Sequence, residues 1–318
     1  MIAVTGANGH LGQLVVEGLV ERVPANQIIA AVRSPENASR FATLGVQVRE
    51  ADYTRPETLS TALHSVKRVL LISAAEVNQR FKLHKAVIDA AKEAGVELFV
   101  YTSLLYADSS GIFLAREHKQ TEEYIRASGL PFVILRNGWY LENHTSDLGN
   151  ALEHGALIGS SNEGRFASAS RADYAAAAVA VLTQPVSENK TYELAGDQSF
   201  SMAELASEVS RQIGRDIPYR NLSHEDYAAI LLGLGLPHTR VHVIIDAAAK
   251  SIRGDLDSSS CDLSGLIGRP TTTLSGAVRD ALRTQERQSE DPANYKTKLG
   301  AEHDEAVFLD DPCGCRCV

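Results

Sequence analysis

Short apolar runs alternate with stretches of helical periodicity along the first half of the chain. An apolar run flanked by turn residues indicates a buried strand, whereas apolar residues three and four positions apart indicate an amphipathic helix. Strands are predicted at Ile2–Val4, Gln27–Val32, Val46–Arg49, Arg68–Ser73, Leu98–Thr102 and Phe132–Leu135. Helices are predicted between them, from Leu11 onward and at Glu36–Leu44, Pro56–His64, Val77–Ala94 and Leu114–Ser128.

Strands that alternate with helices in this way imply a parallel sheet, because right-handed crossovers place the helices on both of its faces. We therefore predict an α/β fold with a Rossmann-type, doubly wound sheet over residues 1–135. A smaller α/β C-terminal lobe is expected at residues 136–282, with some of its elements returning to the sheet. In it we predict helices at Arg171–Thr183 and Met202–Ile213 and a strand at Ile217–Tyr219. This lobe is expected to hold the substrate.

The last part of the chain differs in character. Residues 283–318 are highly charged and lack a sustained apolar period, so we expect a flexible tail. Three cysteines, Cys313, Cys315 and Cys317, lie near its end. Such thiols can bind a soft metal or become oxidised, but no fourth ligand accompanies them, and no metal site is predicted.

The first predicted strand leads into a glycine-rich turn with the sequence T-G-A-N-G-H-L-G. Glycines at this position allow a tight turn, let a pyrophosphate approach the backbone and let the following helix pack closely on the strand. The helix N-terminus then offers unpaired N–H groups to the anion. The alternative is a glycine turn in some other α/β fold. The predicted cofactor contacts are Gly6, Asn8, Gly9, His10, Leu11 and Gly12.

Charge and composition narrow the functional classes. The formal net charge of −9 argues against a protein that binds nucleic acid by neutralising phosphates. No apolar run approaches the roughly 18 residues of a membrane span, and the chain opens on its first strand, so a cytoplasmic location is expected. Cys261 is separated from the cysteines of the tail, which excludes a disulfide framework.

The end of the second strand indicates which nicotinamide cofactor is used. An NAD enzyme would place Asp or Glu there to bind the ribose hydroxyls, whereas this chain has Arg33, whose guanidinium suits the 2′-phosphate of NADP(H). The alternative is an ordinary surface arginine. Asp52 follows the third strand, where the adenine would lie, and the small residues Ser73, Ala74 and Ala75 end the fourth strand beside the cofactor.

The catalytic residues of an ordinary short-chain dehydrogenase are incomplete in this sequence. Ser103 follows the fifth strand and is included among the candidate cofactor contacts. The Tyr-x-x-x-Lys motif is absent, since Tyr106 has no lysine at the right spacing and Tyr124 is followed by Ser128. Without that lysine, nothing evident lowers the pKa of a tyrosine hydroxyl. Carbonyl reduction with a tyrosine as the acid is therefore disfavoured.

Several motifs together resemble the NmrA-like atypical short-chain dehydrogenase/reductases. They are T-G-A-N-G-H-L-G, Arg33, Y-T-S-L-L at 101–105, L-R-N-G-W-Y-L-E-N at 135–143 and A-S-A-S-R-A-D-Y-A at 167–175. Within that family, the sequence is most similar to the bacterial NADPH-dependent quinone oxidoreductases and more distantly similar to triphenylmethane reductase. The similarity covers about Met1 to Leu282.

The resemblance implies roles for particular residues. Relatives often carry a catalytic lysine on the helix after the fifth strand, and alignment of that helix puts His118 there. We expect His118, as a neutral or a protonated imidazole, to hydrogen-bond a quinone oxygen; the alternative is a histidine on the helix surface. His224, His238 and His242 lack acid or cysteine partners at metal-binding spacing and are assigned no role.

The segment after the sixth strand is expected to lie against the nicotinamide and the substrate. Asn137 and Gly138 would let the backbone approach the nicotinamide, and Trp139 and Tyr140 offer flat surfaces to a quinone, with core packing as the alternative for Trp139. Tyr140 is included with His118 as a candidate catalytic residue. Arg171 is expected to approach the cleft or the cofactor, and Asp173 to cap its helix. The apolar segments 231–236 and 241–245 are further candidates for lining the cleft.

These features predict an NADPH-dependent oxidoreductase that transfers hydride to a quinone or a similar conjugated acceptor. Such an acceptor takes up hydride readily and needs little acid catalysis, in keeping with the missing Tyr-x-x-x-Lys motif. One alternative is a non-catalytic NADP(H) sensor that binds a protein partner, and another is a reductase of bulky dyes. The expected partner is a small aromatic molecule, with neither direct nucleic-acid binding nor membrane association, and a homodimer is possible.

Overall fold

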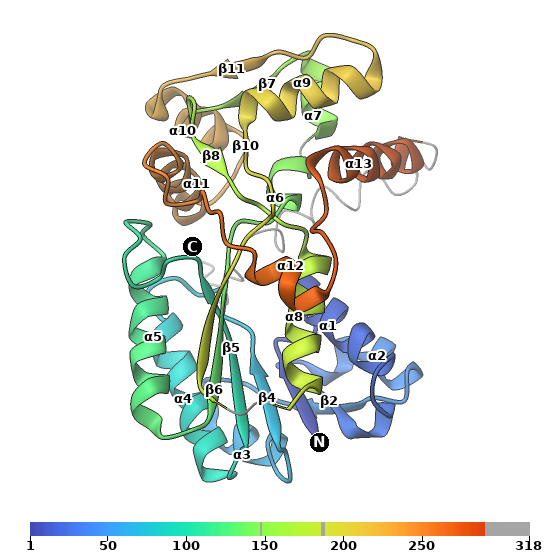
Figure 1. The fold of residues 1–318 in the computed structure, drawn as a ribbon, viewed down its shortest axis with the longest axis vertical. Coiled ribbons are helices and arrows are strands. Elements are labelled where there is room, and N and C mark those ends of the chain that lie inside the picture. Colours follow the sequence, from blue (N-terminus) through green and yellow to red (C-terminus); the bar gives the residue numbers. More distant parts are fainter. Residues whose placement is uncertain (147, 186–187, 290–318) are drawn as a thin grey trace, which may run out of the picture.

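The computed structural model describes residues 1–146, 148–185 and 188–289. In this part of the chain, seven parallel strands form one sheet in the order β3-β2-β1-β4-β5-β6-β9 (Figure 1). The predicted Rossmann-type α/β fold is therefore confirmed. The strands are β1 (Ile2–Thr5), β2 (Ile28–Val32), β3 (Gln47–Glu50), β4 (Arg68–Leu71), β5 (Leu98–Leu104), β6 (Phe132–Asn137) and β9 (Lys190–Leu194).

Helices cover both faces of the sheet. The side chains of successive strand residues point to opposite faces, so each strand contributes to two hydrophobic layers. One layer packs against α1 (His10–Val20), α2 (Ser39–Thr43), α8 (Arg171–Thr183) and α12 (Asp262–Ile267). The other packs against α3 (Pro56–Ala62), α4 (Arg80–Glu93) and α5 (Ala115–Ser128). Both layers are dominated by valine, leucine, isoleucine and alanine, which explains the continuous apolar runs in the sequence.

A smaller lobe lies above the sheet in Figure 1 and has its own hydrophobic core. Its strands form two short pairs, β8 with β10 antiparallel and β11 with β7 parallel. Its strands are β7 (Leu157–Gly159), β8 (Arg165–Phe166), β10 (Phe200–Ser201) and β11 (Tyr219–Asn221). Its helices are α6 (Glu142–Thr145), α7 (Leu148–His154), α9 (Met202–Ile213), α10 (His224–Gly233), α11 (His238–Ser251) and α13 (Leu274–Ser289).

The chain crosses between the lobe and the sheet more than once. After β8, helix α8 packs against α1, and β9 pairs with β6 at the edge of the sheet. Helix α12 later returns and contacts both α8 and β9. The sequence did not suggest β9, because four of its five residues, K-T-Y-E-L, carry polar groups and only Leu194 is fully buried.

Some predicted boundaries were wrong. The helix expected at Glu36–Leu44 is broken at Ala38, whose φ of −114° separates a 3-10 turn at Pro35–Asn37 from α2. The strand expected at Ile217–Tyr219 begins at Tyr219, where pairing with β7 starts. Helix α13 continues past residue 282 to Ser289. The cysteines of the expected tail lie outside the described residues.

The described helices include none that is long and apolar enough to cross a membrane. The same residues contain no group of three or more His, Cys, Asp or Glu side chains arranged to hold a metal ion. Cys261 is exposed and has a free thiol.

Candidate active site

The order of the strands defines where a ligand can bind. The chain starts at β1, builds outward to β3, and then returns to β4 on the other side of β1. In an open parallel sheet, the crevice beyond the carboxyl ends of two such strands is the usual ligand site. Here β1 is followed by the glycine-rich turn and β4 by the segment from Ser73 to Ala75, so these two predicted regions flank the same crevice.

Glycine is needed at the different positions of the turn for different structural reasons. Gly6 has a φ of +62°, a conformation that glycine adopts without strain. A Cβ on Gly12 would collide with Gly6 O and would lie 2.7 Å from the Cα of Ala7, so the helix packs directly on the turn. A Cβ on Gly9 would meet Gly6 O at an ordinary 3.4 Å. The fold therefore requires glycine at position 12 but tolerates a methyl group at position 9.

The N-terminus of α1 is suited to an anion. Gly9 is its N-cap and supplies no side-chain hydrogen bond, and the first turn contains no acidic residue. The backbone N–H groups in the first turn of an α-helix point out of the helix end and carry a partial positive charge. The backbone carbonyl oxygen of Asn8, in the turn, accepts a 2.5 Å hydrogen bond from Gln13 Nε2. These positions fit a pyrophosphate.

Arg33 lies directly after β2, where the adenosine ribose would be recognised. Its side chain is 49% exposed and lies 3.5 Å from Glu76 Oε1, a long contact that a phosphate can replace. Asp52, by contrast, closes its own turn: its carboxylate accepts hydrogen bonds from the Thr54 amide and hydroxyl and from Arg55 Nε. Burial alone would raise the pKa of Asp52, but these hydrogen bonds hold it below its usual value. Its contact with adenine stays a prediction.

A pocket at the ends of β4, β5 and β6 brings many of the predicted residues together. The pocket lining does not include the predicted residues Ala74, Ala75 and Arg171. It does include Thr102, which was not among the predicted site residues and whose hydroxyl accepts a 2.9 Å hydrogen bond from the backbone N–H of Ser73. The lining residues are Ser73, Thr102, Ser103, Leu104, Leu114, His118, Asn137, Gly138, Trp139, Tyr140 and Asn143. Residues from separate strands meet here because the carboxyl ends of parallel strands lie at one edge.

His118 points from α5 into the protein. The residue is 3% exposed, lines the pocket and has its Nδ1 atom 2.7 Å from the hydroxyl of Tyr101, so the surface alternative is wrong. Burial keeps the pKa of His118 well below its usual value, and the charge of Arg80 and the nearby His84 act in the same direction. The imidazole is therefore neutral near pH 7 and acts as a hydrogen-bond donor or acceptor rather than as a cation.

Asn137, the last residue of β6, supplies an unusual acceptor. Its side chain is 5% exposed, and its Oδ1 atom has no hydrogen-bond partner among the described residues. An unpaired buried acceptor that lines a pocket fits a ligand that brings an N–H group, such as the carboxamide of nicotinamide. Gly138 follows, and a Cβ there would lie 3.0 Å from the Tyr174 hydroxyl and 3.2 Å from Leu194 O. Its small size therefore allows close packing within the protein itself.

Trp139 and Tyr140 are both half-buried and line the pocket. Trp139 also packs against the core of the smaller lobe, so the expected core contact and the expected site contact coexist. Tyr140 contacts Tyr174 edge-on, and the guanidinium of Arg171 lies 4.7 Å from the centre of its ring. Arg171 also donates a 3.2 Å hydrogen bond to Asn143 Oδ1. In this structure it therefore contacts two pocket-lining residues, Tyr140 and Asn143, without lining the pocket itself.

The N-terminus of α8 anchors this region. Ser170 and Asp173 form a capping box, which confirms the expected cap. The Asp173 carboxylate also accepts a hydrogen bond from the backbone N–H of Thr272 and forms an ion pair with Arg269. Helix α8 thereby holds Arg171 against Tyr140.

A buried ionic network behind the pocket was missing from the sequence-based prediction. Arg136 donates two hydrogen bonds to the carboxylate of Glu122, at 2.9 and 2.7 Å, and a third to Glu193 at 2.6 Å. The Ser103 hydroxyl donates to the same Glu122 at 2.6 Å. Ser103 thus lines the pocket while its hydroxyl proton is directed toward Glu122. The motif T-E-E-Y contains Glu122, but nothing local distinguishes it from an exposed helix residue.

The segment after β4 is also held by buried side chains that the sequence did not reveal. Ala74 N–H donates to His84 Nε2 at 2.8 Å, and Ala74 O accepts a 2.8 Å hydrogen bond from Nε of the fully buried Arg80. Ala75 follows as a half-buried residue. The backbone beside the crevice is therefore fixed from within the protein.

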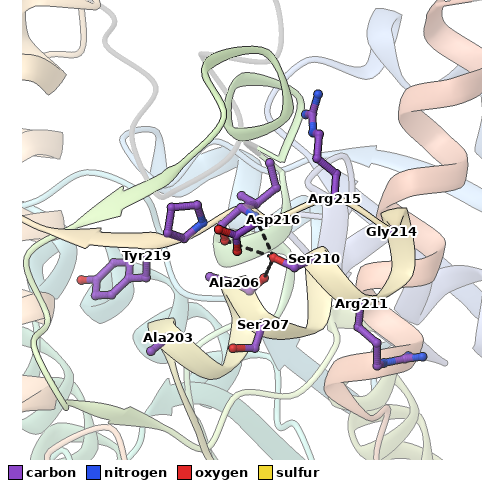
Figure 2. Close-up of a pocket in the computed structure, with 11 residues that line it drawn as sticks. Ala203, Ala206, Ser207, Ser210, Arg211, Gly214, Arg215, Asp216 and Tyr219 are labelled. Carbon is purple, nitrogen blue, oxygen red and sulfur yellow. Dashed lines mark hydrogen bonds between the residues drawn. The ribbon is translucent and has the colours of Figure 1, made fainter.

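A larger groove lies elsewhere, on the smaller lobe between α9 and the segment that leads to β11 (Figure 2). Its volume is about 620 Å³, and small residues of α9, such as Ala203 and Ser207, form its floor. Figure 2 shows Ser210 within it, hydrogen-bonded to Ala206 O and to the backbone of Ile217. None of the predicted site residues lines this groove, so its size does not make it the candidate site.

Comparisons with known proteins show which family the chain belongs to. Residues 6–185 match the model of a family described as NAD(P)H-binding. The chain is 48% identical over 278 residues to quinone oxidoreductase 2 of Escherichia coli (strain K12), covering 87% of this chain and 97% of that protein. The crystal structure of that enzyme complexed with NADPH superposes with a TM-score of 0.86, covering 89% of this chain and all of the other.

Further relatives connect the chain to a wider group. Triphenylmethane reductase of Citrobacter sp., in complex with NADP(H), is 36% identical with a TM-score of 0.85 and covers 88% of this chain and all of the other. An NmrA-like family domain-containing oxidoreductase of Aspergillus flavus is 32% identical over 70% of this chain and 75% of its own length. The chain therefore belongs to the NAD(P)H-binding family and, within it, to the NmrA-like atypical short-chain dehydrogenase/reductases.

Proposed function

We propose that this protein is an NADPH-dependent oxidoreductase that transfers hydride to a quinone. The observation that carries the proposal is the pocket at the ends of β4, β5 and β6, in which neutral His118, the unpaired amide oxygen of Asn137 and the rings of Trp139 and Tyr140 meet. The similarity to a quinone oxidoreductase over nearly its full length supports the same activity. The direct test is acceptor-dependent oxidation of NADPH.

The residues present fit NADPH. The N-terminus of α1 would bind the pyrophosphate, Arg33 the 2′-phosphate, and Asn137 the carboxamide of the nicotinamide. When bound, NADPH supplies the hydride, and the overall reaction consumes one further proton to give the hydroquinone and NADP⁺. The protein contributes position, orientation and exclusion of water.

The polar groups of the pocket assist by hydrogen bonding. His118 is neutral and can donate one ring N–H to a quinone oxygen as negative charge develops there. The Ser103 hydroxyl is engaged by Glu122 and does not serve this purpose. Trp139 and Tyr140 offer flat apolar surfaces to the acceptor ring. Proton uptake to complete the hydroquinone comes from solvent.

Replacing His118 tests its role as a donor. We expect His118→Phe to lower kcat for quinones about 10- to 30-fold, the value of one hydrogen bond to a developing charge, while His118→Gln, which keeps a donor, loses less. Because its pKa lies well below 6.5, His118 remains neutral as the pH falls from 8 toward 6.5, and the wild-type rate should show no inflection from it. A rate that rises with acidity in this range and is flat in His118→Phe would contradict a neutral donor.

Replacing Arg33 tests cofactor choice. We expect Arg33→Glu to raise the KM for NADPH by about 30-fold or more, since it removes a charged partner of the phosphate and adds repulsion, with little change in the KM for NADH. Arg253→Glu makes the same charge change at an exposed position of the smaller lobe and should alter neither value. If Arg33→Glu raised the KM for NADH as much as the KM for NADPH, Arg33 would not contact the 2′-phosphate.

The pocket favours a neutral acceptor over a cationic dye. Among the described residues that line it, none is a carboxylate, and the available groups are hydroxyls, amides, an imidazole and aromatic rings. A triphenylmethane dye tested beside a quinone distinguishes the two reductase activities. If the protein bound NADP(H) but reduced neither acceptor, the alternative function as a non-catalytic NADP(H) sensor would be favoured. A cytoplasmic location and a homodimer remain predictions.

A further inference from the structure

Tyr101 and His118 form a hydrogen-bonded pair at the pocket. Tyr101 lies on β5 and is fully buried, His118 lies on α5, and the Tyr101 hydroxyl oxygen is 2.7 Å from His118 Nδ1. We propose that Tyr101 is a positioning residue that donates its hydroxyl proton to His118 Nδ1 and thereby fixes the imidazole in the tautomer whose N–H is at Nε2. Its catalytic consequence rests on the proposed function.

The chemistry of the two groups decides which one donates. A phenol is a stronger donor than a neutral imidazole N–H, and the unprotonated imidazole nitrogen is the stronger acceptor. A separation of 2.7 Å is typical of a hydroxyl donor and short for an N–H donor. Burial raises the pKa of Tyr101 and lowers that of His118, so the phenol keeps its proton and the ring stays neutral. Nδ1 then accepts, and Nε2 carries the ring proton.

A neighbouring histidine shows the opposite arrangement. His84 Nε2 accepts a hydrogen bond from the backbone N–H of Ala74, which can only donate, so the ring proton of neutral His84 must lie on Nδ1, 3.0 Å from Thr121 Oγ1. The rings of His84 and Tyr101 are in edge contact at 5.2 Å. Both nitrogens of His84 are thus occupied by the protein, whereas His118 has one nitrogen held by Tyr101 and itself lines the pocket.

A fixed tautomer matters because the two nitrogens have opposite hydrogen-bonding roles. If Nδ1 carried the proton, Nε2 would present a lone pair, which repels a quinone oxygen. With Tyr101 as the donor to Nδ1, every His118 ring is ready to donate from Nε2, and no fraction of the enzyme is lost to the wrong tautomer.

Kinetics of paired variants test whether Tyr101 acts through His118. We expect Tyr101→Phe to lower kcat for quinones about fivefold, since the tautomer is no longer held, without changing the KM for NADPH. In the His118→Phe background the same change should cause no further loss. Tyr124→Phe removes a hydroxyl that donates to Asp89 of α4, outside the pocket lining, and should leave kcat unchanged. A full additional loss in the double variant would overturn the proposal.

The tautomer itself can be observed without turnover. In protein with ¹⁵N-labelled histidine rings, the spectrum of His118→Phe identifies the His118 signals by their absence. We expect an unprotonated Nδ1 and a protonated Nε2 in the wild type, and signals shifted toward a mixture in Tyr101→Phe. A protonated Nδ1 in the wild type would overturn the proposal, even if Tyr101→Phe failed to fold. If quinones were not reduced at all, the proposed function would fail, while the spectrum would still decide the tautomer.

Discussion

Replacing Arg136 with methionine should lower the free energy of unfolding by about 3–5 kcal/mol, the usual cost of removing one partner from a buried ion pair. Arg136 is buried in the network behind the pocket and makes two hydrogen bonds to Glu122, which is itself buried. Methionine fills similar space but leaves the buried Glu122 carboxylate with only one charged contact, the 3.4 Å contact to the exposed Arg126. Urea unfolding of wild type and variant measures the difference.

Arg126 provides a matched control for this experiment. It also pairs with Glu122, at 3.4 Å, but its side chain is 44% exposed. We expect Arg126→Met to cost less than about 1 kcal/mol, because solvent screens the charge of the exposed Arg126 side chain. Adding Glu122→Gln to Arg136→Met should restore part of the lost stability by removing the buried negative charge that Arg136 no longer neutralises. Similar losses for the two arginine variants would mean that burial does not determine the strength of this network.

Replacing Gly12 with alanine should both destabilise the fold and abolish NADPH binding. The added Cβ would lie 2.7 and 2.9 Å from backbone atoms of Ala7, which no side-chain rotation can relieve. Such overpacking costs about 1–3 kcal/mol or more and would push α1 away from the turn. Urea unfolding and a fluorescence titration with NADPH measure the two effects separately.

The variant Gly9→Ala distinguishes an effect on protein stability from an effect on cofactor affinity. The backbone of Gly9 has a φ of −69°, which alanine adopts freely, and the new methyl group meets protein only at 3.4 Å. We expect stability within about 0.5 kcal/mol of wild type but at least a tenfold weaker affinity for NADPH, because the methyl group enters the space beside the pyrophosphate. Unchanged affinity in Gly9→Ala would show that the turn does not cradle a phosphate.

The features that the sequence predicted correctly are those with a local cause. Buried parallel strands leave apolar runs such as Leu98–Thr102, and the turn after β1 needs glycine for steric reasons that operate within a few residues. The fold also determines that the ends of β5 and β6 lie side by side. His118 and the segment from Asn137 to Tyr140, which the family resemblance assigned to the site, therefore line one pocket although they come from different elements.

What the sequence did not reveal depends on distant partners. Arg136 and Glu193 are far apart along the chain and meet because β9 pairs with β6, and β9 itself has a weak apolar pattern. Glu122, next to polar neighbours in the sequence, is buried by that same network. The tautomer of His118 depends on Tyr101, which reads as an ordinary strand residue until the structure places the two side chains together.

The most direct test of the proposed function follows the absorbance of NADPH with and without a panel of quinones, and repeats the measurement with NADH. We expect rapid oxidation of NADPH that depends on the quinone, little oxidation without it, and much slower turnover with NADH at equal concentration. If NADPH binds tightly and no quinone accelerates its oxidation, the protein is not a quinone reductase, and the pocket at His118 and Asn137 serves binding alone.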